Sequence, residues 1–397
     1  MSAMFEKTLI DASCGYRSDD WELDPTALRL PGRKTAPVGI SFFRLHGGRQ
    51  EGADIIQVDN GVFDFMVVPT RGMGILDGEC HGVRLGWDSP VEEVVHPQFV
   101  NLESMNGIGW LNGFNEWVVR CGLSSNGAAF TDASGRRVTL HGTIANTPAS
   151  LATVSVDLEA PYTIRVTGRV VQVGMFLDHF VLETEIATEP GANWIRITDR
   201  VTNCKATPAC MQMLYHNNYG TPLMSKGARV VIPAECAMPR DSSYSRESIK
   251  GWNRQLAPTP GIGEECWFFV PKGDRAGNTR HMLVNGDGDL AVVQAYSLKS
   301  LPCFALWKNP AATEDGYVTG LEPATNYPNP TDYEQARRRT VKLAPGKSWE
   351  MAMTISLQQG RKEIAAEEKK IKAIQGRRPV EVLSAPRKGF SPAADGQ

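Results

Sequence analysis

Apolar and polar residues alternate with a period of two through much of this chain. The alternation is clearest in residues 163–170, 180–186 and 194–201. A period of two puts every second side chain on the same face, which is typical of a strand with one buried face. Residues 189–193 contain Pro and Gly and predict a turn between the last two segments. These segments therefore predict neighbouring antiparallel strands.

Strand-like runs separated by Gly, Asn, Asp and Pro fill residues 38–357, with almost no helical periodicity. Many strands with few helices favour one large β-sandwich domain. We expect a helix from about Arg361 to Gly376, where good helix formers carry mixed charges. Residues 1–37 are expected to form an N-terminal arm. Residues 358–397 are expected to hold the helix and a poorly ordered tail.

Composition excludes several classes of protein. The 397 residues are 42% hydrophobic, enough for a substantial core, and the net charge of -2 lacks the basic excess of a nucleic-acid binder. No apolar run approaches the roughly 18 residues that span a bilayer, and the first residues do not resemble a signal peptide. The eight cysteines are scattered without C-x-x-C spacing, so we expect reduced, mostly buried thiols. We therefore expect a cytoplasmic protein that binds neither nucleic acid nor membrane.

Three titratable side chains stand among residues that favour turns or close packing. His141 precedes a glycine, His216 precedes two asparagines, and Glu322 precedes a segment with two prolines and two asparagines. We expect His216 at the end of a strand and Glu322 in an irregular loop. Each residue alone is more commonly structural. Together they form a minimal acid–base set, which moves protons without a cofactor.

Two further positions extend this candidate set. Gly142 leaves room for a ligand or another chain segment to approach His141. Arg71 lies beside a glycine at a predicted strand end, where its guanidinium can donate two hydrogen bonds to sugar hydroxyls or to a carboxylate. A plain surface arginine fits that position equally well.

The order of these stretches resembles the aldose 1-epimerase (galactose mutarotase-like) family, and most of all its less-studied aldose-1-epimerase-like members. The arginine stretch, the His-Gly stretch, the His-Asn-Asn stretch before Thr-Pro-Leu and the Leu-Glu-Pro stretch follow the family's order over about residues 38–357. Residues 199–203 resemble the strand that leads into the family's site. The resemblance implies an all-β fold, a large antiparallel β-supersandwich, here with a short C-terminal helix.

The resemblance also implies a reaction, the interconversion of the α and β anomers of a sugar. Glu322 would be the general base for the C1 hydroxyl, and His216 the general acid for the ring oxygen. His141 would orient the sugar and stabilise developing charge, and Arg71 would hold hydroxyls. Such chemistry needs no metal or nucleotide, so we expect no cofactor. A small-molecule sugar is the expected partner, and a homodimer is left open.

The chain departs from the well-characterised members after His216, where they have an aromatic residue and Phe-Asn-Leu. Residues 110–117 form an aromatic, Asn-rich insert like that of the sister group. Aromatic faces stack on sugars and amides bond hydroxyls, although two core tryptophans fit the insert as well. The family's sugar-binding aspartate has no clear counterpart here, and Asp241 and Asp287 are candidates with nothing to choose between them. The candidate sugar contacts are Arg71, Trp110, Asn115, Asn218 and Asn326.

Other functions remain open from the sequence. A non-catalytic carbohydrate-binding protein can use the same fold, because fold does not fix function. A glycosidase or lyase using the same cleft would need a second carboxylate opposite Glu322, with Glu116 and Glu103 as candidates. A zinc site built from His141, His216 and Glu322 is a weaker alternative, since no closely spaced ligand pair exists.

Overall fold

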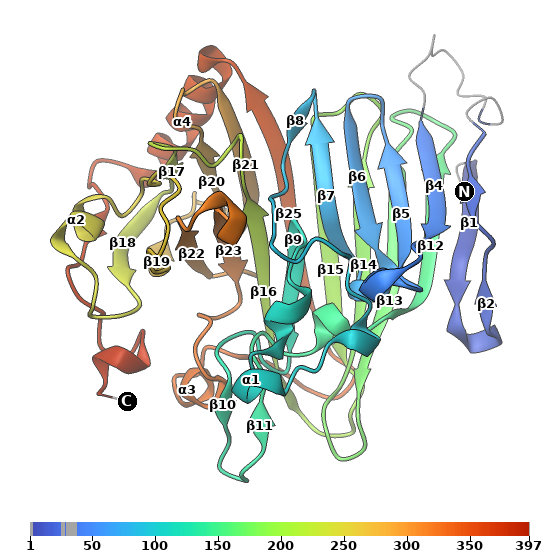
Figure 1. Cartoon of the computed structure of the whole chain (residues 1–397), viewed down its shortest axis with the longest axis horizontal. Helices are drawn as coiled ribbons and strands as arrows, with labels where there is room; N and C mark the ends of the chain where they lie inside the picture. The colour runs from blue at the N-terminus through green and yellow to red at the C-terminus, as the bar shows by residue number, and fades with distance from the viewer. Residues whose placement is uncertain (1–2, 25–27, 29–37, 397) are drawn as a thin grey trace.

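Two large β-sheets packed face to face make up most of the molecule (Figure 1). The structure is a computed structural model that describes residues 3–24, 28 and 38–396. Among these residues, neighbouring strands of both sheets pair antiparallel except for one short parallel pair, β18 with β26. The all-β fold expected from the sequence is confirmed.

The first sheet has ten strands. In order they are β17 (Arg229–Val231), β20 (Asn278–Val284), β21 (Leu290–Ser297), β25 (Ser348–Gln359), β15 (Trp194–Asn203), β14 (His179–Thr188), β13 (Ile164–Val173), β12 (Ala149–Asp157), β1 (Met4–Asp11) and β2 (Tyr16–Arg17).

The second sheet has fourteen strands. Along its main path they are β26 (Glu381–Val382), β18 (Ala234–Pro239), β19 (Glu265–Pro271), β22 (Cys303–Asn309), β23 (Val318–Ala324), β16 (Ala209–Tyr219), β9 (Val118–Leu123), β7 (Gly74–Cys80), β6 (Phe63–Val68), β5 (Asp54–Asp59), β4 (Gly39–Arg44) and β3 (Trp21–Glu22), with β8 (Val83–Arg84) beside β7 and β24 (Val341–Leu343) beside β16.

Little helix accompanies the sheets. The α-helices of the described residues are α1 (Ser104–Gly107), α2 (Arg246–Lys250), α3 (Thr331–Ala336) and α4 (Arg361–Gln375). A small separate hairpin is formed by β10 (Phe130–Thr131) and β11 (Arg137–Val138). Within the described part of the chain, no helix is both long and apolar enough to cross a membrane.

The three strands expected from the alternating pattern are β13, β14 and β15. They pair in sequence order, and their side chains alternate between buried and more exposed positions as predicted. Their buried side chains, including Leu182, Ile186 and Ile197, join the main core between the sheets. Burying each such side chain contributes roughly 1.5–3 kcal/mol, so this core holds the two sheets as one body.

The first residues of the chain belong to both sheets. β1 pairs with β12 at one end of the ten-stranded sheet, and β3 pairs with β4 at one end of the fourteen-stranded sheet. Leu9 and Leu23 are buried in the main core, because strand pairing carries these residues across the end of the sandwich. Residues 25–27 and 29–37 of the predicted arm lie outside the described residues.

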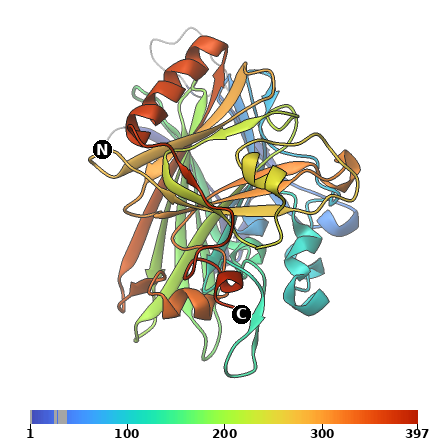
Figure 2. The same ribbon diagram turned by 90° about the vertical axis from the view of Figure 1, so that its left-hand side faces the viewer.

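The predicted C-terminal helix is α4, which ends at Gln375 with Gly376 as its C-cap, close to the expected boundary. Ile364 and Ile371 pack on β20 and β21 of the ten-stranded sheet. The chain then descends along the side formed by β18 and β19 (Figures 1 and 2). Residues 377–396, expected from composition to be poorly ordered, instead add β26, and Phe390 packs against a second hydrophobic cluster. The division into arm, domain and tail stays a prediction.

Candidate functional site

β16 separates two environments, because its side chains point alternately to opposite faces. Met213, Tyr215 and Tyr219 enter the main core between the sheets. Leu214 joins the second hydrophobic cluster on the other face of the fourteen-stranded sheet. His216 and Asn218 share the parity of Leu214, so they lie on this second face, away from the sandwich interior.

His216 and Glu322 lie opposite each other on neighbouring strands. The β16–β23 ladder pairs Leu214 with Ala324 and Asn217 with Leu321, and the two titratable residues lie between these pairs. Nε2 of His216 is 3.2 Å from Oε1 of Glu322, and the two side chains are only 6% and 3% exposed. The structure thus brings together two residues that are distant in the sequence.

Both residues lie inside strands, so the sequence-based expectation of a strand end and a loop was wrong. β16 continues to Tyr219, and Glu322 is in the interior of β23, between β16 and β22. The misleading signal was Pro323, which is rare in central strands because it cannot donate a ladder hydrogen bond. Here the ladder to β16 is interrupted beside this proline, which accommodates it.

Burial shifts both pKa values of the pair towards the uncharged forms. Burial raises the pKa of Glu322 to about 8, helped by Glu264 and opposed by Arg240. Burial lowers the pKa of His216 to about 3, with His141 acting in the same direction. At neutral pH these shifts favour a carboxylic acid beside a neutral imidazole. In that state the pair carries one proton, on the carboxyl group of Glu322, whose Oε1 makes no hydrogen bond within the described residues.

His141 completes the group expected from the sequence. Its ring centroid is 5.5 Å from that of His216, and its Nδ1 is 2.9 Å from the carbonyl oxygen of Asn126. The backbone at His141 has a positive φ of 59°, and Gly142 has a φ of 70°. Gly142 has no room for a Cβ, which would lie 2.3 Å from the carbonyl oxygen of Gly122. The close approach at Gly142 is therefore to another chain segment.

Aromatic rings cover the two histidines. Trp110 lies 4.7 Å from His141, Phe114 lies 5.2 Å from His216, and Trp307 lies 5.3 Å from His216, measured between ring centroids. Trp110 and Phe114 are buried, whereas Trp307 is only half-buried. Sequence reasoning singled out the insert with Trp110 but missed Trp307, which stands alone in an ordinary strand and gave no signal.

Arg71 and Asn115 are both buried, so Arg71 is not a surface arginine. The guanidinium of Arg71 donates to Glu116 at 2.6 Å, and both side chains are fully buried. It also donates to the carbonyl oxygen of Val95 and to the side chain of Asn146. The amide of Asn115 donates to two main-chain carbonyls at 2.8 and 3.1 Å. A direct sugar contact for either residue stays a prediction.

Asn326 supports the loop behind His141. Its amide exchanges hydrogen bonds with the side chain of Asn126 at 3.0 and 3.2 Å and donates to Gln212 at 2.9 Å. Because the carbonyl of Asn126 accepts from His141, Asn326 fixes that histidine indirectly. Its predicted role as a sugar contact is untested, and it is fully buried.

A charged rim adjoins the pair. Trp307 Nε1 donates to Glu264 at 2.6 Å, and Arg240 pairs with both Glu264 and Asp241. Asp241 is therefore linked to the His216 face, whereas Asp287 lies in the turn between β20 and β21 of the other sheet. Of the two aspartates left open by the sequence, the geometry favours Asp241 as the one near the site.

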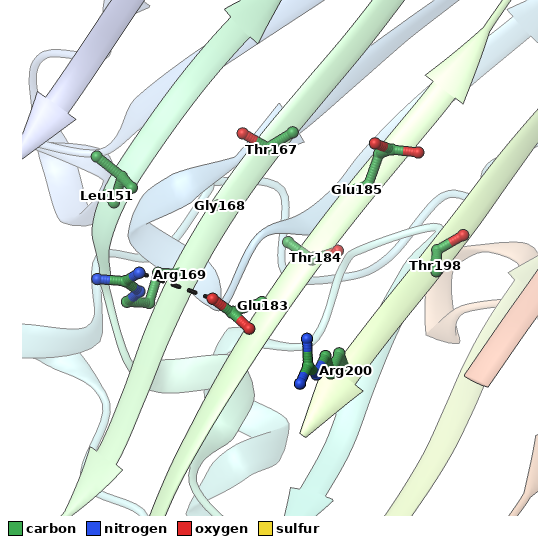
Figure 3. Close-up of a pocket in the computed structure, with 9 residues that line it drawn as sticks. All are labelled: Leu151, Thr167, Gly168, Arg169, Glu183, Thr184, Glu185, Thr198 and Arg200. Atoms are coloured by element: carbon green, nitrogen blue, oxygen red, sulfur yellow. Dashed lines mark ion pairs between the residues drawn. The ribbon is translucent and has the colours of Figure 1, made fainter. Parts of the chain in front are cut away.

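A shallow hollow of about 290 Å³ lies elsewhere, on the outer face of β13, β14 and β15 (Figure 3). Arg169 and Glu183 pair across the strands at 3.6 Å, and Glu183 is also opposite Arg200. Opposite charges in direct cross-strand register typically contribute about 0.2–1 kcal/mol each. We interpret this surface as a solvated charge ladder that stabilises the sheet.

One known protein family matches most of the chain. Residues 50–357 match the family described as a domain of unknown function, DUF4432. None of the curated proteins matches the chain.

Solved structures share the fold. A protein from Klebsiella pneumoniae, provisionally named an aldose 1-epimerase, is 37% identical over 96% of this chain and 98% of its own, with a TM-score of 0.92. A galactose mutarotase-like protein from Clostridium acetobutylicum is 15% identical over 81% of this chain and 98% of its own, with a TM-score of 0.55. The second likeness concerns the fold alone.

Proposed function

The chain belongs to the galactose mutarotase-like proteins, within the DUF4432 family, and from this premise we propose that it is a cofactor-independent sugar mutarotase. It interconverts the α and β anomers of an aldose or aldose derivative by general acid–base ring opening. The observation that carries the proposal is the buried His216–Glu322 pair, with 3.2 Å between Nε2 and Oε1.

This short distance suits anomer interconversion. The C1 hydroxyl and the ring oxygen are bonded to the same carbon, so a base and an acid acting on them must be close together. Glycosidases commonly use two carboxyl groups, roughly 5–5.5 Å apart in retaining enzymes and roughly 6.5–9.5 Å apart in inverting enzymes. Glu116, a candidate second carboxylate, is bound to Arg71 instead. The pair therefore supports ring opening better than glycoside hydrolysis.

The proton transfers of the pair also balance over one catalytic cycle. In ring opening, Glu322 takes a proton from the C1 hydroxyl while His216 gives one to the ring oxygen. The cycle starts when the one proton of the pair moves from Glu322 to His216, which gives carboxylate and imidazolium, and ring opening leaves carboxylic acid and neutral imidazole. After rotation at C1, closure returns both protons by the reverse transfers and yields the other anomer. Each positioned transfer typically contributes about 10²- to 10⁴-fold in rate.

Access to the pair requires movement of its cover. His216 and Glu322 are both buried, and the rings of Trp110, Phe114 and Trp307 lie against His216. Trp307 is half-buried, so it is the aromatic ring that an arriving sugar meets first. Exclusion of water strengthens the electrostatic interactions of the pair once a sugar is bound.

The test is a panel of freshly dissolved pure anomers, followed by polarimetry or one-dimensional NMR with and without the protein. We expect at least one aldose to equilibrate faster with the protein than in buffer alone. If no sugar responds, but some show line broadening on binding, the non-catalytic carbohydrate-binding function is supported instead. The panel includes neutral, phosphorylated and oxidised sugars, which the pair alone does not distinguish.

The single proton that the pair carries predicts a bell-shaped pH dependence. Activity requires one proton on the pair. It falls as pH rises through about 8, where Glu322 and His216 lose that proton, and as pH falls through about 3, where they gain a second. We expect kcat/KM, corrected for the uncatalysed reaction, to decline about tenfold per pH unit above the upper limb. A rate that stays constant to pH 10 would contradict this assignment.

Gly320 predicts a second, sterically controlled effect. A Cβ at this position would lie 2.7 Å from Glu322 Oε1 and 3.1 Å from His216 Cε1. Because the nearest atom is the end of a flexible side chain, Gly320→Ala should remain folded with a displaced carboxylate. Misplacing a reacting group by about 1 Å can cost on the order of 10²-fold, and we expect a kcat loss approaching that.

The matched control for this glycine is Gly263→Ala. Gly263 has no atom within 4 Å of its added Cβ, so that variant should keep wild-type kinetics. Full activity in Gly320→Ala would show that the position of Glu322 is not critical.

A further inference from the structure

Asn218 is held by three hydrogen bonds in a fully buried position beside His216. Its Oδ1 is 2.6 Å from Nδ1 of His216. Its Nδ2 donates to the carbonyl oxygen of Glu116 at 2.9 Å and to that of His216 at 3.1 Å. Because carbonyl oxygens only accept, the NH₂ group must face them, and this fixes the orientation of the amide.

This orientation determines where the imidazole carries its proton. The amide oxygen of Asn218 is an acceptor only, so Nδ1 of His216 must be the donor. A neutral His216 then has its lone pair on Nε2, the atom that is 3.2 Å from Glu322 Oε1. The opposite tautomer would place two lone pairs against each other at 2.6 Å and would leave Nε2 unable to accept a proton.

The support behind Asn218 is itself rigid. The carbonyl of Glu116 also accepts from Trp87 Nε1 at 3.2 Å. The carboxylate of Glu116 is bound to Arg71 at 2.6 Å, with both side chains fully buried. Burial of such a pair leaves it few alternative arrangements, because either charge alone would be strongly disfavoured there. The chain of contacts therefore runs from Arg71 through Glu116 and Asn218 to His216.

We propose that Asn218 is a positioning residue that locks His216 in the Nδ1–H tautomer, with the Arg71–Glu116 pair holding Asn218 in place. The inference rests on the proposed function for its consequence, since the locked tautomer presents Nε2 to the reacting sugar. Nδ1–H donates to Asn218 in both the neutral and the protonated states of His216. The ring therefore need not turn during the proton cycle.

This role differs from the sugar contact expected from the sequence. Asn218 is fully buried, and each N–H of its amide already has a main-chain acceptor. The residue acts on the reaction through His216 rather than by touching the substrate.

The test is two-bond ¹H–¹⁵N NMR of protein labelled at histidine nitrogens, which distinguishes Nδ1–H from Nε2–H directly. Loss of a peak set in His216→Ala assigns its signals. We expect His216 of the wild type to be the Nδ1–H tautomer near pH 7, and Asn218→Leu to gain the Nε2–H form. In the same variant kcat should fall about 10²-fold or more with a smaller change in KM, since a neutral Nε2–H imidazole cannot take up on Nε2 the proton that His216 exchanges with the ring oxygen.

Asn218→Asp keeps an acceptor facing Nδ1, but its second oxygen then faces the carbonyl oxygens of Glu116 and His216, which only accept, so this oxygen must carry a proton. The variant should retain the Nδ1–H tautomer. Asn193→Leu is the matched control, because Asn193 also donates to a main-chain carbonyl, that of Leu357, on the other sheet. It should leave the His216 signals unchanged.

The tautomer measurement tests the role of Asn218, and the activity measurement tests the proposed function, so either can be contradicted without the other. An Nε2–H tautomer for wild-type His216 overturns the inference whatever the activity. An Nδ1–H tautomer in a protein that accelerates no anomer interconversion would retain the positioning of His216 by Asn218 and overturn the proposed function. An Nδ1–H tautomer that persists in Asn218→Leu would show that Asn218 does not determine it.

Discussion

Replacing Glu322 by Gln is expected to lower the catalysed rate of anomer interconversion by about 10²- to 10⁴-fold, and His216→Ala is expected to lower it by a similar factor. Each change removes one of the two groups that we propose to exchange protons with the sugar. Glu322→Gln preserves the shape of the side chain, and burial raises the pKa of Glu322 to about 8, so the carboxyl group is mostly uncharged at neutral pH and the variant should remain folded. Kinetics are measured by polarimetry on the sugar that responds in the wild type.

The double variant makes this prediction sharper. Residues that act as a unit are strongly non-additive, so Glu322→Gln with His216→Ala should be little slower than either single variant. Glu314→Gln is the control, because Glu314 is an exposed glutamate outside the strands. Wild-type rates in both single variants would end the proposed mechanism. Losses that multiply in the double variant would show two independent contributions.

Replacing Asp199 by Ala lowers the free energy of unfolding by about 3–5 kcal/mol, a large fraction of the roughly 5–15 kcal/mol that stabilises a typical protein. Asp199, on β15, accepts from Arg120 of β9 at 2.6 and 3.0 Å and from Tyr215 of β16 at 2.8 Å. The network bridges the two sheets inside the main core. Its loss would leave the guanidinium of Arg120 buried without a counter-charge.

Urea unfolding followed by tryptophan fluorescence measures this effect. Thr198→Ala, on the same strand but directed to the outer face, should change the unfolding free energy by less than about 1 kcal/mol. Removing both charges with Asp199→Leu and Arg120→Met should recover part of the loss, since an apolar pair of similar volume replaces an uncompensated charge. An unfolding free energy of Asp199→Ala within about 1 kcal/mol of the wild type would contradict the prediction.

The class of fold could be predicted from the sequence because the patterns that indicate strands and helices are local. The alternation in β13, β14 and β15 depends only on residues two apart, and the helix formers of α4 act within a few turns. The structure of the segment after α4 could not be predicted in this way. Its composition resembles a disordered tail, but Leu383 and Phe390 find a hydrophobic cluster that only the folded sheet provides.

The candidate site could be predicted in part from the sequence. The residue types and their order singled out His141, His216 and Glu322, and the structure places the three close together or in contact. The local environment of Glu322 was mistaken for a loop, because Pro323 is unfavourable in a central strand unless the ladder is interrupted. Whether that interruption exists depends on the neighbouring strand β16, which lies far away in the sequence.

The sequence by itself determined the class of fold and the C-terminal helix, since both depend on residue type and short spacing, and the order of its motifs singled out the candidate acid–base residues. Only the tertiary structure decided that His216 faces Glu322, that Asn218 faces His216, and that Arg71 is buried against Glu116. The physical reason is strand register. The partner of a side chain across a sheet is set by pairing between distant segments, and a shift of one residue would turn that side chain to the opposite face.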